Sequence, residues 1–128
     1  MKLHGKTNKQ LSENLEKFPE YVIECNLAEI LSNRGITQKE FSQLTGIPVG
    51  ALSQFANLKR STINLTHLLV IIQTLRLTDI SELFKIKIPE NLRDLIEQDQ
   101  KDIDFYGKLP EQEEYLRLLR ENKKASVK

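Results

Sequence analysis

The chain has 128 residues, with 19 basic and 18 acidic side chains, a net charge of +1, and 39% apolar residues. This length suits one compact domain with a helical appendage, and the composition excludes disorder throughout. The near-neutral charge excludes a protein that coats nucleic acid regardless of sequence. The longest apolar run, residues 68–72, is too short to span a membrane. Because the basic start has no apolar signal segment, we expect a cytoplasmic protein.

Few residues offer reactive chemistry. The two histidines, His4 and His67, and the single cysteine, Cys25, have no spacing typical of a catalytic triad or a metal site. Cys25 lies in a pattern of helical spacing, which favours the role of a small buried hydrophobe. A Gly-rich phosphate loop is missing from the sequence. We therefore expect no enzyme, no catalytic residue, no cofactor and no metal.

The first segment of the chain is polar. Residues 1–17 carry too few large apolar side chains for a core, and we expect a flexible arm with a helical tendency near Leu11. Pro19 suits the first position of a helix, and Gly35 suits its end. Between them the apolar residues recur at helical spacing, which predicts a first helix over residues 19–34: Val22, Ile23, Leu27, Ile30 and Leu31.

Two short helices follow. Thr37 and Glu40 have the spacing of a capping box, in which each side chain satisfies a free backbone N–H group, and Gly46 can end the helix that begins there. Pro48 restarts the chain as a third helix, which ends near Asn57. Its core side consists of Ala51, Leu52 and Phe55, and the residues on the other side are Val49, Gly50, Ser53 and Gln54.

Asn64 can cap a fourth helix, because apolar residues follow it at helical spacing: Leu65, Leu68, Leu69, Ile72 and Leu75. Thr78 or Asp79 can cap a short fifth helix that contains Ile80, Leu83 and Phe84. Pro89 marks the next boundary. The sequence thus predicts an all-α domain of five helices over residues 18–88, with residues 1–17 as an arm.

Residues 89–128 form a more charged, helical C-terminal extension. One stripe, ended by Gly107, is apolar: Leu92, Leu95, Ile96, Ile103 and Tyr106. Such a stripe requires a partner surface, since each large side chain gains roughly 1.5–3 kcal/mol on burial. One candidate surface is a second stripe formed by Phe18, Val22 and Cys25. Docking within one chain, across a homodimer or onto another protein are the alternatives, and we favour the homodimer.

Residues 26–84 resemble the Cro and lambda-repressor-like helix-turn-helix family. The resemblance covers about half the chain, and several motifs carry it together: residues 35–42 (GITQKEFS), residues 44–48 (LTGIP), residues 52–55 (LSQF), Asn57, and residues 64–84 from Asn64-Leu65 to Leu83-Phe84. It implies a lambda-repressor-like fold whose third helix, residues 48–57, enters the major groove of double-stranded DNA.

The resemblance also assigns roles to residues. The positions that face base edges are occupied by Pro48, Val49, Gly50, Ser53 and Gln54. The positions that hold the DNA backbone are occupied by Thr37, Gln38, Asn57, Lys59 and Arg60. The remaining predicted interface is the dimer or partner surface formed by Phe18, Val22, Leu92, Leu95, Ile96, Ile103 and Tyr106.

The chain departs from its relatives at two places. Relatives often carry Arg, Gln, Ser or Thr where this chain has residues 49–51 (VGA), so no recognition-helix Arg is available for guanine. Gln54 can bond bidentately to adenine and Val49 can contact a thymine methyl group, so we expect A·T-leaning or shape-based specificity. At Leu58 many relatives have a Gly that closes the third helix, and the resemblance leaves the geometry of this loop open.

Together these features predict a bacterial or phage transcriptional regulator, a repressor that binds double-stranded DNA as a homodimer. The alternative is a protein-interaction module that keeps the helix-turn-helix fold without specific DNA binding, for example an antitoxin-like or phage or plasmid regulatory partner. We expect no interaction with a membrane.

Overall fold

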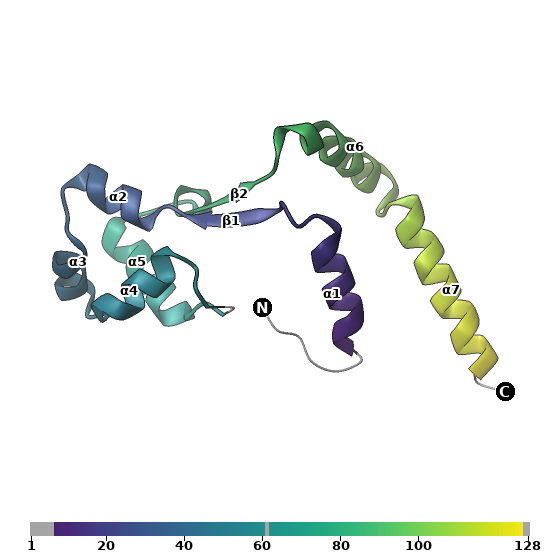
Figure 1. Ribbon diagram of the computed structural model, residues 1–128, viewed down its shortest axis with the longest axis horizontal. Coiled ribbons are helices and arrows are strands. Elements are labelled where there is room, and N and C mark those ends of the chain that lie inside the picture. The colour runs from purple at the N-terminus through teal and green to yellow at the C-terminus, as the bar shows by residue number, and fades with distance from the viewer. Residues whose placement is uncertain (1–6, 61, 127–128) are drawn as a thin grey trace. The chain divides into compact units, whose positions relative to one another are not determined.

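A computed structural model describes residues 7–60 and 62–126 of the chain (Figure 1). Its elements in order are α1 (Thr7–Lys17), β1 (Val22–Cys25), α2 (Leu27–Arg34), α3 (Gln38–Thr45), α4 (Val49–Ala56), α5 (Leu65–Leu75), the 3-10 helix η1 (Ile80–Glu82), β2 (Phe84–Lys87), α6 (Glu90–Tyr106) and α7 (Pro110–Ser126). The contacts fall into two units, one up to Lys87 and one from Ile88. The predicted helical domain with a helical extension is confirmed, with two short strands in addition.

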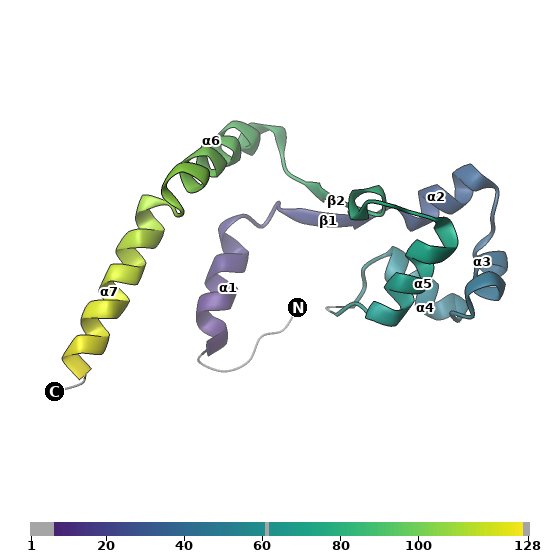
Figure 2. The same cartoon turned by 180° about the vertical axis from the view of Figure 1, so that it is seen from behind.

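The core of the first unit lies among α2, α3, α4 and α5, which cluster together in both ribbon views (Figures 1 and 2). Its buried members are Leu27, Leu31, Phe41, Ile47, Leu52, Phe55, Ile71, Leu75 and Leu83. Each of the four helices is short, so each buries only one or two large side chains, and their combined burial drives the folding of the domain.

Strands β1 and β2 pair as an antiparallel ribbon, which replaces parts of two predicted helices. Val22 lies opposite Lys87 and Cys25 lies opposite Phe84. The helix predicted over residues 19–34 therefore begins only at Leu27, as α2, and the predicted fifth helix is reduced to η1, followed by β2. Ribbon formation satisfies the backbone of residues 22–25 across the domain, an interaction that helical spacing in the sequence cannot reveal.

The ribbon packs on the core at one end only. Cys25 and Phe84 are half-buried, and the Phe84 ring lies 5.7 Å from the Phe55 ring between centroids. Burial raises the pKa of the Cys25 thiol, which keeps it protonated and consistent with its predicted role as a small hydrophobe. Ile23, one of the apolar residues of the helix predicted over residues 19–34, is 58% exposed, since it lies farther along the strand opposite Ile86.

Three of the predicted helix boundaries are confirmed by the structure. Asn64 caps α5, because its Oδ1 accepts the backbone N–H of His67 at 3.1 Å. Gly35 ends α2 in the left-handed conformation, with φ of 70°. Asp79 caps η1 by accepting the backbone N–H of Ser81 at 2.8 Å. Local hydrogen-bond chemistry thus sets these boundaries, as the sequence indicated.

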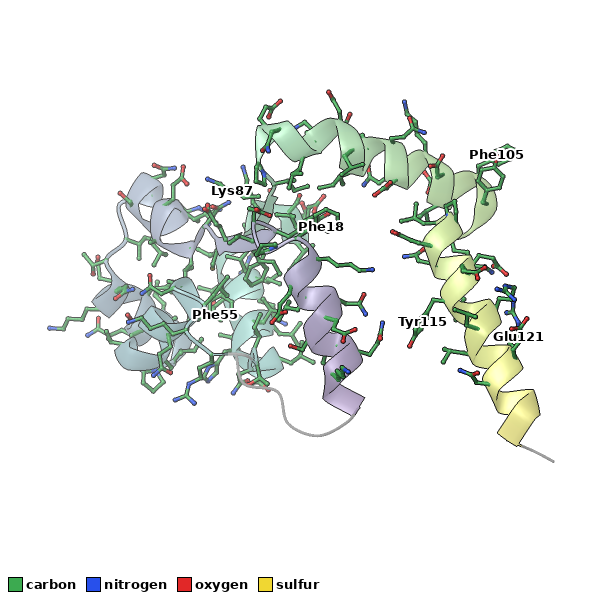
Figure 3. All side chains as sticks on the ribbon, turned by 45° about the vertical axis from the view of Figure 1, so that its right-hand side comes forward. Phe18, Phe55, Lys87, Phe105, Tyr115 and Glu121 are labelled. Atoms are coloured by element: carbon green, nitrogen blue, oxygen red, sulfur yellow. The ribbon has the colours of Figure 1, made fainter. Side chains whose placement is uncertain are left out.

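The helix predicted near Leu11 is present as α1, and the rest of the predicted arm, residues 1–6, lies outside the described residues. In the extension, α6 ends at Gly107, whose φ is 86°, as predicted. On α7, Tyr115 and Glu121 project from opposite sides (Figure 3). No helix in the described ranges is both long and apolar enough to cross a membrane.

Candidate nucleic-acid interface

The turn between α3 and α4 sets the relation of these two helices. Gly46 adopts the left-handed conformation with φ of 81°, and its N–H donates to Ser42 O at 2.8 Å. The hydroxyl of Ser42 donates to Ile47 O at 2.6 Å, and Ile47 N–H donates to Thr45 Oγ1 at 3.1 Å. Because Ile47 is itself buried in the core, the turn is fixed from both the polar and the apolar side.

The start of α3 is a complete capping box. Thr37 Oγ1 accepts the N–H of Glu40 at 3.1 Å, and Glu40 Oε1 accepts the N–H of Thr37 at 3.0 Å. The hydrogen bond from the Thr37 N–H holds the pKa of the Glu40 carboxyl below its usual range. Gln38 is half-buried at the first position of the helix.

Helix α4 has one buried and one accessible side. Leu52 and Phe55 are buried in the core, as predicted. We name the opposite side the reading face: Pro48, Val49, Gly50 and Gln54, all exposed, and Ser53, half-buried. The helix contains no charged residue, so the polar groups of this face are one hydroxyl and one amide.

Leu58 closes α4 in the left-handed conformation, with φ of 49°. Its N–H donates to Phe55 O at 3.2 Å, and Lys59 N–H donates to Gln54 O at 3.1 Å, which is the hydrogen-bond pattern of a Schellman motif. Glycine usually occupies this position because a side chain there costs about 1–2 kcal/mol. The loop therefore keeps the geometry that glycine gives, at the expense of strain.

The turn at Leu58 brings Arg60 back to the reading face. Arg60 Nε donates to Gln54 Oε1 at 2.8 Å. The sequence placed Gln54 among the base-facing residues and Arg60 among those that hold the backbone, and it gave no sign that the two side chains bind one another. A leucine at residue 58 gives no sequence signal for the left-handed turn that brings them together.

One family model matches this part of the chain, over residues 26–88. It is described as a Cro/C1-type HTH DNA-binding domain. Residues 26–88 form a Cro/C1-type helix-turn-helix DNA-binding domain. Comparisons with curated proteins and with solved structures gave no significant match. The Cro/C1-type domain begins directly after β1 and includes β2, whereas α1, α6 and α7 lie outside it.

The residues predicted to hold the DNA backbone lie at both ends of the helix-turn-helix of this domain. Thr37 and Gln38 begin α3, and Asn57, Lys59 and Arg60 follow α4. Asn57 Nδ2 donates one of its two hydrogens to Ser53 O at 3.0 Å. This bond does not use the second amide hydrogen. Their contacts with DNA stay a prediction.

The Cro/C1-type domain also contains a hollow between α4 and the start of α5. It measures about 480 Å³, and its lining includes the polar residues Gln54, Arg60 and His67 and the apolar residues Phe55 and Ile63. Gln54 and Arg60 thus border open space next to α4.

Only some of the residues predicted to form the dimer surface lie on one helical face. Phe18 follows α1 and Val22 lies in β1, so these two residues do not share a helical face with Cys25. That part of the prediction is wrong, because the backbone of Val22 is engaged in strand pairing. On α6 the stripe is helical: Ile96 is buried, Leu92 is half-buried, and Leu95, Ile103 and Tyr106 are exposed.

Proposed function

We propose that this protein is a sequence-specific transcriptional regulator, a repressor, that places α4 in the major groove of double-stranded DNA. The observation that carries the proposal is the uncharged, accessible reading face of α4, preceded by a rigid turn and followed by Lys59 and Arg60. A helix of this kind presents donors, acceptors and a Val side chain to base edges, while the adjacent cations neutralise phosphates.

Selection of binding sites from random duplex DNA tests the proposal. The full chain is expected to enrich one family of sequences, which a Gln54→Ala variant binds more weakly by roughly 1–3 kcal/mol. Unrelated DNA is expected to bind both proteins equally weakly. Enrichment of no sequence by the full chain contradicts the proposed function.

Salt dependence gives a second, independent measurement. Lys59 and Arg60 supply two cations per protomer, so a dimer releases about four counterions, and the log–log slope of affinity against salt is on the order of −4. The overall charge of +1 supplies no comparable effect. A slope near zero contradicts a phosphate-binding role for these residues.

We further propose that α6 holds two copies of the chain together through its apolar stripe. The exposure of Leu95, Ile103 and Tyr106 supports this, because an apolar stripe of this length gains free energy when it is covered. A symmetric dimer presents two α4 helices to half-sites about 34 Å apart, which compensates for the few polar groups on each reading face.

A second candidate function is a protein-interaction module that uses the same fold without specific DNA binding. The observation in its favour is the large number of exposed apolar residues on α7, namely Tyr115, Leu116, Leu118 and Leu119. This function predicts that the full chain enriches no DNA sequence and that binding of a protein partner is lost when α7 is removed.

A further inference from the structure

The hydrogen bond between Arg60 and Gln54 fixes which end of the Gln54 amide is available. A guanidinium group has donors only, so the Gln54 atom 2.8 Å from Arg60 Nε must be the acceptor, Oε1. The amino group on Nε2, which carries two hydrogens, is then the end of the amide directed away from Arg60. Gln54 is exposed, so this amino group can reach a ligand on the reading face.

We propose that Arg60 positions Gln54 as a donor, so that this protein prefers guanine at the base pair that Gln54 contacts. The inference rests on the proposed function, since it requires α4 to lie in the major groove. It differs from the A·T preference expected from the sequence, which treated the Gln54 amide as free to turn.

The preference follows from what each base presents in the major groove. Guanine offers two acceptors, N7 and O6, to an amino group with two hydrogens. Adenine offers N7 beside the N6 amino group, and bidentate binding there requires Gln54 to accept as well as donate. The bond from Arg60 uses one of the two lone pairs of Oε1 and places the guanidinium group at the acceptor end of the amide. The Nε2 donors are then the end of Gln54 that is open to a base edge, so adenine loses its advantage over guanine.

The backbone after α4 supports a fixed arrangement. Gln54 and Arg60 are six residues apart, and the left-handed Leu58 reverses the chain between them. The bond from Lys59 N–H to Gln54 O, at 3.1 Å, anchors this reversal to the same residue whose side chain Arg60 holds. A strained turn therefore brings the two side chains together, as is common at functional sites.

Arg60 can also link the reading of a base to the position of the backbone. The bond to Gln54 uses the Nε–H group, one of five guanidinium donors. The two terminal nitrogens can still bind a phosphate bidentately. Correct seating of the DNA backbone on Arg60 thus favours the donor orientation of Gln54, and Arg60 acts as a positioning residue for specificity.

The test uses the full chain and a matched pair of variants, Arg60→Met and Lys59→Met. Each removes one positive charge beside α4, but only Arg60→Met removes the bond to Gln54. The Gln54→Ala variant first identifies the contacted base pair, as the position where selection is relaxed. Affinities are then measured for duplexes that carry each of the four base pairs at that position.

The unmodified chain and Lys59→Met are expected to prefer guanine over adenine by about tenfold. In Arg60→Met the Gln54 amide is free to turn, so this preference is expected to fall to within about twofold or to reverse toward adenine. A general loss of phosphate binding weakens all four duplexes alike, so it leaves this ratio unchanged. The ¹⁵N–¹H resonances of Gln54 Nε2 report the fixed amide directly, and they are expected to shift in Arg60→Met.

Two results overturn the inference alone: adenine preferred by the unmodified chain at this base pair, or an unchanged guanine preference in Arg60→Met. Selection of no sequence by the unmodified chain overturns the proposed function, and the inference with it. The first two results leave sequence-specific binding intact, so the two failures are distinguishable.

Discussion

The Cro/C1-type domain and the C-terminal extension use helices in different ways. Helices α2 to α5 are short, yet together with Ile47 of the turn and Leu83 they bury nine large apolar residues in one core. Helices α6 and α7 each have 17 residues, yet Ile96 is the one buried residue among their described side chains. Helix length and burial are therefore unrelated here, and the domain obtains its stability from packing between elements.

The ion pairs of α7 illustrate what stabilises a helix without a core. Arg117 pairs with Glu114 and Glu121 within its own helix, and Glu113 binds Lys108 at 2.9 Å and Arg120 at 3.1 Å. Exposed pairs of this kind contribute little to stability, because water screens the charges. Such pairs favour the helical state of α7, but they do not cover its exposed apolar residues.

The largest effect on the free energy of unfolding is expected when an aromatic side chain is removed from the core of the domain and not from the extension. Phe41→Ala removes a fully buried ring and is expected to lower the free energy of unfolding by about 3–5 kcal/mol. Tyr115→Ala, on the exposed face of α7, is expected to change it by less than about 0.5 kcal/mol. Urea unfolding followed by circular dichroism measures both, and similar losses contradict the contrast between the two units.

A chain that ends at Ile88 tests whether the extension serves association. We expect it to unfold cooperatively, because the core lies before that residue. It is also expected to sediment as a monomer and to bind its DNA site about a hundredfold more weakly, or roughly 2.7 kcal/mol. If this shortened chain still dimerises and binds normally, α6 is not the dimerisation element.

A smaller effect is expected at the start of α3. Thr37→Ala removes the hydroxyl that caps the helix, and the free energy of unfolding is expected to fall by about 1 kcal/mol. Thr37→Ser keeps the cap and serves as the control. Thermal unfolding of both variants provides the measurement, and equal stability of the two contradicts the role assigned to the capping box.

The smallest expected effect is a gain. Leu58→Gly removes the strain of a side chain in the left-handed region, about 1–2 kcal/mol, but adds flexibility to the unfolded chain that costs about 0.5–1 kcal/mol. The net stabilisation is therefore about 0.5 kcal/mol, measurable by urea unfolding against Leu58→Ala, which keeps the strain. A Leu58→Gly variant that is less stable than Leu58→Ala contradicts the description of this turn as strained.

The sequence predicted those parts of the fold that local chemistry determines. Thr37, Asn64 and Gly46 act within their own turn of chain, so their patterns gave the correct ends of α3 and α5. The segment around Val22 was assigned to a helix, because four residues fit both helical and extended spacing. Its partner strand lies at the far end of the domain, and only tertiary structure decides between the two conformations.

In the candidate site, too, the sequence could predict some features and not others. The accessible side of α4 could be predicted, since Leu52 and Phe55 must face the core and the remaining positions follow from helical geometry. The pairing of Gln54 with Arg60 could not, because it depends on the φ value of Leu58. A leucine gives no sequence signal for the left-handed conformation, which glycine or asparagine would have given.

The pairing of β1 with β2 has a consequence for protein engineering. Val22 lies opposite Lys87, so the chain enters and leaves the domain at neighbouring positions. A domain with adjacent ends can be inserted into an exposed loop of an unrelated host protein without stretching either junction. The same closure allows circular permutation, in which a short linker joins the ribbon strands and new termini open elsewhere on the surface.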